Sequence, residues 1–68
     1  MDEEAFNMSV RKFLKQLGIT AQREIELGVR GRLDAGELDT AATLPARATI
    51  SVEGLPDDIV VTGEIRLA

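Results

Sequence analysis

The feature that most constrains this 68-residue chain is an alternation of apolar and mostly polar side chains near its C-terminus. The alternation covers residues 46–53 and 59–67, and the segment between them contains Gly54 and Pro56. A period of two is typical of strands that bury one face, so the pattern predicts an antiparallel β-hairpin. A two-stranded hairpin is at best marginally stable alone in water, and we therefore expect it to pack against another part of the chain.

The charged residues of the hairpin suggest its register. Pairing Val52 with Ile59 sets Arg47 opposite Glu64 and leaves a turn of about four residues, whereas a shift by two would oppose Arg47 and Arg66. Opposite charges stabilise a cross-strand pair and like charges destabilise it, so we expect Arg47 to face Glu64.

Two segments with helical periodicity precede the hairpin. The first, residues 3–17, has Asp2 as a capping residue and an apolar stripe, and Gly18 follows as a left-handed C-terminal stop. The second, residues 21–35, follows Thr20 as a cap and ends at Gly36. The stripe of the first segment consists of Phe6, Val10, Phe13, Leu14 and Leu17, and that of the second of Ile25, Val29 and Leu33.

The order of these elements predicts an α+β fold of the type ααββ. We expect an αα-hairpin packed on one face of a two-stranded antiparallel β-hairpin, in a single small domain over residues 1–68 with a connector at 36–45.

Composition argues against most kinds of chemistry. The chain has no His, Cys, Trp or Tyr, and no complete catalytic or phosphate-binding motif. We expect no enzyme activity, with carboxylate-only chemistry as the one exception, and neither a cofactor nor a metal site. An acidic start without a long apolar run indicates a cytoplasmic protein that does not enter a membrane.

Several runs of residues resemble a family of short uncharacterised bacterial proteins. The resemblance extends over nearly the whole chain, and it implies a bacterial cytoplasmic origin and the order helix, helix, hairpin. It implies no activity, cofactor or site residue. The runs that carry it are residues 6–15, residues 18–26, Leu44-Pro45-Ala46 and Gly63-Glu64-Ile65.

One candidate binding surface lies on the first helical segment. Met8 falls on the side opposite the apolar stripe, among Arg11, Lys12 and Lys15, and an apolar tip surrounded by cations suits an acidic partner. A solvated face with one isolated exposed Met is the more common meaning of such a pattern, since single exposed apolar residues need no explanation. Leu27 lies off its stripe in the same way, and we expect it in the core, because a helix held between the first helix and the sheet needs apolar residues on two sides; a second contact is the alternative.

These features favour a small non-catalytic protein-interaction module. Its partner is another protein or a second copy of the chain, paired through the edge of the strand at residues 59–67. The alternative is a truncated winged helix-turn-helix protein that binds nucleic acid. The net charge of −4 makes a nucleic-acid partner the less favoured one, because an acidic surface repels phosphate.

Overall fold

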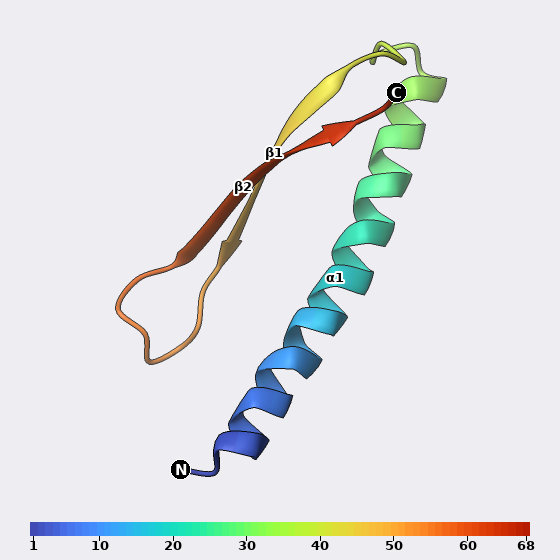
Figure 1. Cartoon of the computed structure of the whole chain (residues 1–68). Coiled ribbons are helices and arrows are strands. Elements are labelled where there is room, and N and C mark those ends of the chain that lie inside the picture. The colour runs from blue at the N-terminus through green and yellow to red at the C-terminus, as the bar shows by residue number, and fades with distance from the viewer. The chain divides into compact units, whose positions relative to one another are not determined.

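The computed structural model describes all residues from Met1 to Ala68. The chain forms one helix, α1 (Glu3–Asp34), followed by two strands, β1 (Thr43–Ile50) and β2 (Ile59–Arg66), which pair as an antiparallel hairpin (Figure 1). The fold is therefore α+β, as expected. It divides into two compact units, Met1–Glu37 and Leu38–Ala68, and each is described below by itself.

Helix α1 begins where the sequence predicts. Asp2 has an extended backbone (φ −83°, ψ 105°), and its carboxylate accepts a hydrogen bond from the backbone N–H of Ala5 at 3.1 Å. This bond satisfies one of the four N–H groups that have no partner inside a helix. Glu3 and Glu4 occupy the first turn, where the helix dipole favours negative charge.

The expected αα-hairpin is wrong, because α1 is one continuous helix through Gly18 and Thr20. The only glycines with positive φ are Gly36 and Gly54, so Gly18 is not a left-handed stop. A glycine inside a helix costs about 1 kcal/mol relative to alanine. Ending the helix there would leave unpaired carbonyl and N–H groups on both sides of the break, and continuing it is the smaller cost.

The predicted stop at Gly36 is confirmed. Gly36 has φ 72°, and its N–H donates to the carbonyl oxygen of Leu33 at 3.0 Å, while the N–H of Glu37 donates to that of Arg32 at 2.9 Å. This pair of bonds is the Schellman motif, which needs a left-handed residue and so favours glycine. An ion pair between the side chains of Arg32 and Glu37 spans the same turn.

The connector between α1 and β1 is shorter than expected and contains a turn at Asp39. Its carboxylate accepts a hydrogen bond from the N–H of Ala41 at 2.9 Å, and its carbonyl oxygen accepts one from the N–H of Ala42 at 3.0 Å. Such a side-chain bond two residues ahead is a common way for aspartate to reverse the chain. β1 then begins at Thr43 instead of residue 46.

The hairpin forms as predicted, but its register differs from the predicted one. Arg47 lies opposite Thr62 and Ile50 opposite Ile59, so the predicted pairs of Arg47 with Glu64 and of Val52 with Ile59 are both wrong. The strands are shifted by two residues relative to the prediction. A single cross-strand charge pair contributes only about 0.2–1 kcal/mol, which is too little to set a register by itself.

The loop between the strands is correspondingly longer, and it covers residues 51–58. Within it the N–H of Leu55 donates to the carbonyl oxygen of Val52 at 3.1 Å, and Gly54 has φ 99°. The hydroxyl of Ser51 donates to the carboxylate of Asp58 at 2.8 Å and ties the two ends of the loop together.

The predicted faces of the hairpin survive the change of register, because a shift by two returns each side chain to the same face. One face carries the four apolar cross-strand pairs Leu44–Ile65, Ala46–Gly63, Ala48–Val61 and Ile50–Ile59. No side chain of either unit is buried. The packing of helical residues on this face stays a prediction.

Candidate functional site

The four residues proposed as a binding surface lie together on α1. Met8, Arg11, Lys12 and Lys15, with Ser9, line one open groove of about 510 Å³. Spacings of three and four residues place side chains on the same side of a helix, and the unbroken helix keeps this face in one geometry.

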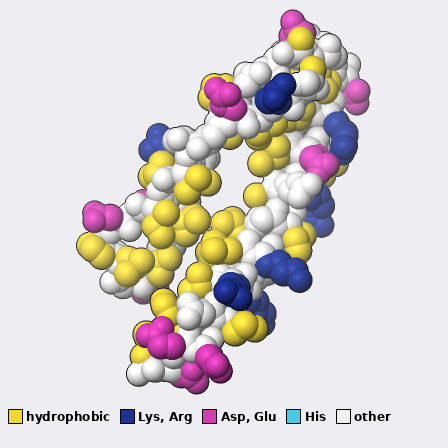
Figure 2. Space-filling view, viewed as in Figure 1, with side chains coloured by type: hydrophobic (Ala, Val, Ile, Leu, Met, Phe, Trp, Pro, Cys, Tyr) yellow, Lys and Arg dark blue, Asp and Glu magenta, His cyan; other side chains and the backbone are white.

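The cations of this groove have no acidic partner in the helix. The ion pairs of the chain join Arg30 to Glu26 and Arg32 to Glu37, and none involves the groove. No Asp or Glu occurs between residues 5 and 23. Figure 2 shows a run of Lys and Arg side chains along one side of the helix, with apolar side chains on the other.

The groove continues toward the C-terminal half of α1. A second hollow, of about 450 Å³, shares Lys12 and Lys15 with the first and adds Gln16, Ile19 and Thr20. A third, of about 320 Å³, begins at Ile19; its other lining residues are Gln22, Arg23, Glu26, Leu27 and Arg30. Shared residues join the three hollows into one surface, which we name the cationic face and define as the residues lining them, from Met8 to Arg30.

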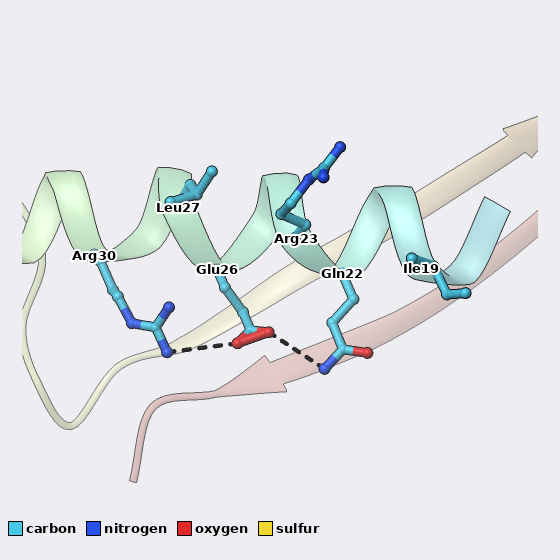
Figure 3. A pocket seen from close by; sticks show the side chains of 6 residues that line it. All are labelled: Ile19, Gln22, Arg23, Glu26, Leu27 and Arg30. Atoms are coloured by element: carbon cyan, nitrogen blue, oxygen red, sulfur yellow. Dashed lines mark hydrogen bonds and ion pairs between the residues drawn. The ribbon is translucent and has the colours of Figure 1, made fainter. Parts of the chain in front are cut away.

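Figure 3 shows how the third hollow is made. Arg23 and Leu27 point to one side, and Gln22, Glu26 and Arg30 point to the other. The carboxylate of Glu26 accepts hydrogen bonds from Gln22 at 3.2 Å and from Arg30 at 3.4 Å. The single carboxylate of the cationic face is thus held by two neighbours, while Arg23 has no ion pair.

Sequence reasoning missed Ile19 and favoured a core position for Leu27. Both are exposed, at 61% and 58%, as is Met8 at 65%. The helical spacing that relates Ile19 to Met8 and Lys15 could have shown its place, but the sequence analysis ended the helix at Gly18. In a continuous helix Met8, Lys15 and Ile19 lie on one side of α1, because spacings of seven and four residues are close to whole turns. Leu27 lies about 80° further around the axis than Ile19.

The cationic face combines positive charge with exposed apolar side chains. Ammonium and guanidinium groups attract carboxylates or phosphates, and the three exposed apolar tips add contacts that water does not replace. No three acidic side chains lie close enough together to hold a metal ion.

The winged helix-turn-helix alternative does not fit the structure. That motif needs two helices joined by a turn, so that the second can enter the major groove. Residues 18–20, where the turn was expected, are helical. The chain therefore lacks the unit on which this alternative depended.

Comparison with known proteins places the chain in a family. One family model matches residues 1–68, and it describes a family of unknown function, DUF6494. The chain belongs to this family. Neither the curated proteins nor the solved structures contain a match. Membership in DUF6494 agrees with the resemblance seen in the sequence and assigns no activity to the cationic face. The helix of this DUF6494 chain is not apolar enough over its length to cross a membrane.

Proposed function

We infer that this chain is a non-catalytic protein-interaction module, and that its cationic face binds an acidic segment of a partner protein. The observation that carries this inference is the groove at Met8, where an exposed apolar tip stands among three cations without a neighbouring carboxylate. A surface whose only role is solubility usually mixes both signs of charge. It does not need several charges of one sign around an exposed apolar residue.

A protein partner fits this face better than nucleic acid does. The chain carries a net charge of −4, which opposes a polyphosphate more strongly than a short acidic segment, because the long-range repulsion grows with the charge of the partner. Both aromatic residues, Phe6 and Phe13, belong to the apolar stripe, so the cationic face offers no ring for stacking on a base. Exposed apolar tips, in contrast, can be buried against apolar residues of a protein partner.

The test uses the labelled full chain and a short acidic probe. The probe is a disordered peptide of about twelve residues with Asp, Glu and Gly around a single Leu. In an NMR titration we expect the amide shifts to change at residues 8–15 and the affinity to fall with added salt. Charge reversal in the K12E/K15E double variant should weaken binding at least tenfold.

A matched control separates the groove from the total charge. The R47E/R66E double variant changes the net charge by the same amount, and both arginines lie on the polar face of the hairpin, opposite Thr62 and Thr43. This variant should retain at least half of the affinity. An equal loss in the two double variants, or shift changes spread over the whole chain, would show that the groove is not a specific site.

A further inference from the structure

Helix α1 is apolar along one side as well as cationic along the other (Figure 2). Successive residues of a helix are about 100° apart around its axis, so a set of residues between positions 6 and 28 falls within an arc of about 120°. We name this set the apolar arc; it consists of Phe6, Val10, Phe13, Leu14, Leu17, Ala21, Ile25 and Gly28. Its large side chains are 36–49% exposed, and a contiguous exposed apolar surface indicates a contact site.

Charge marks the two ends of this surface. The charged residues of α1 that point in the direction of the apolar arc are Glu3, Glu24 and Arg32. Glu3 precedes the arc and Arg32 follows it, so the ends carry opposite charge, and Glu24 lies near one margin. In a parallel pair of such helices each charge would lie beside its own copy, whereas an antiparallel pair brings opposite ends together.

From this pattern we propose that the apolar arc binds a second copy of the chain, with the two α1 helices antiparallel about a two-fold axis near residue 19. Residues equally far from residue 19 on its two sides then face each other, and each contact occurs twice. Glu3 of one copy and Arg32 of the other differ in level by about 4.5 Å along the axis, within one turn.

The apolar arc is complementary to itself in side-chain size. About this axis its N-terminal half, which holds most of the large side chains, faces its C-terminal half, which holds the small ones. The facing pairs are Phe13–Ile25, Leu17–Ala21 and Val10–Gly28. Setting large residues against small ones lets two helices approach closely along their whole contact.

Gly28 provides room for one of these contacts. A Cβ at this position would meet no atom within 4 Å, and the backbone has no positive φ there. Nothing within a single chain therefore requires glycine, which lowers the stability of a helix interior. In the antiparallel pair Val10 of the second copy occupies the space beside Gly28.

The hairpin of the same chain matches the apolar arc less well. Each of its strands has eight residues and spans about 26 Å, whereas Glu3 and Arg32 are about 44 Å apart along α1. The apolar face of the hairpin consists of apolar cross-strand pairs and offers no charge to either end of the arc. A second α1 has both the length and the charges.

This pairing leaves the cationic face accessible. Met8, Lys15 and Ile19 lie about 140–180° around the axis from the centre of the apolar arc. A dimer therefore presents two cationic faces, turned away from each other, and its formation does not depend on what they bind.

The first test is the mass of the full chain in sedimentation equilibrium between low micromolar and millimolar concentration. We expect the mass to rise from 7.4 kDa to twice that value. Leu17→Glu places a carboxylate inside the arc and should weaken the dimer at least tenfold. Ile19→Glu is the matched control on the opposite side of α1 and should leave the mass unchanged, with equal helix content by circular dichroism.

Gly28→Leu covers the case in which Leu17→Glu loses its helix. Leucine is a better helix former than glycine, so a single chain should keep or gain helix content. The side chain would fill the space expected for Val10, and the dimer should weaken at least tenfold.

A charge exchange tests the antiparallel direction. E3R and R32E each place like charges together at both ends of an antiparallel pair, and each should weaken the dimer about threefold or more. The E3R/R32E double variant restores opposite charges and should regain the affinity of the parent chain. In a parallel pair the double variant would regain nothing.

A distance gives an independent measure of direction. The chain has no cysteine, so Ala5→Cys introduces one site for a spin label on each copy. Labels at residue 5 should be about 42 Å apart along the axis in the antiparallel pair and less than half as far apart in a parallel one.

Three results would overturn the proposal. They are a single species of 7.4 kDa at every concentration, a dimer that Leu17→Glu and Gly28→Leu leave intact, and short distances between the labels at residue 5. The second result would assign the contact to another surface, such as the free edge of β2. None of them affects the acidic peptide titration, so the proposed function of the cationic face stands or fails separately.

Discussion

Replacing Gly18 by alanine tests the largest difference between sequence and structure. Gly18 lies inside α1 with helical hydrogen bonding and without positive φ. A Cβ built at this position meets no side chain of the helix within 4 Å. The structure therefore has both the backbone conformation and the space that alanine needs.

The expected effect is a gain in stability. Alanine in a helix interior is favoured over glycine by about 0.8–1 kcal/mol, partly because the unfolded chain loses freedom. No strain or contact at Gly18 subtracts from this value. For a chain of this size, about 1 kcal/mol raises Tm by roughly 4–8 °C. If Gly18 were instead a left-handed stop between two helices, alanine there would cost about 1–2 kcal/mol.

The assay is thermal and urea denaturation followed by circular dichroism at 222 nm. Gly36→Ala is the matched control, because Gly36 has φ 72° and the same substitution there should lower stability by about 1 kcal/mol or more. Opposite signs at the two glycines would support one continuous helix. A loss of stability in the Gly18→Ala variant, of the same size as at Gly36, would refute it.

Three further predictions follow from particular contacts. Asp2→Ala removes the hydrogen bond from Ala5 and should lower stability by about 1 kcal/mol, measured by the same denaturation. NMR contacts across the strands should join Arg47 to Thr62, and finding Glu64 in that place would contradict the register. Because β2 has one unpaired edge, self-association through it would give a concentration-dependent mass in sedimentation equilibrium. A single species at 7.4 kDa up to millimolar concentration would exclude that interface.

The candidate site shows how far sequence reasoning reaches. Met8, Arg11, Lys12 and Lys15 are close in sequence, and helical spacing alone places them on one face. The extension to Ile19, Arg23 and Leu27 depends on the helix passing through Gly18. Because of an error in one local conformation, the predicted surface therefore ended at Lys15 instead of Arg30.

The sequence by itself determined the ends of the helix and the faces of the hairpin. Asp2 and Gly36 act through local bonds, to Ala5 and Leu33, and alternation at a period of two assigns every strand residue to a face without knowledge of its partner. Only the folded structure decided whether Gly18 breaks the helix and which residues oppose each other across the sheet. In both cases the residue that served as the signal contributes only about 1 kcal/mol, and both registers keep the same faces. The energy difference between two competing conformations is a sum over many bonds and contacts, and no single residue reveals it.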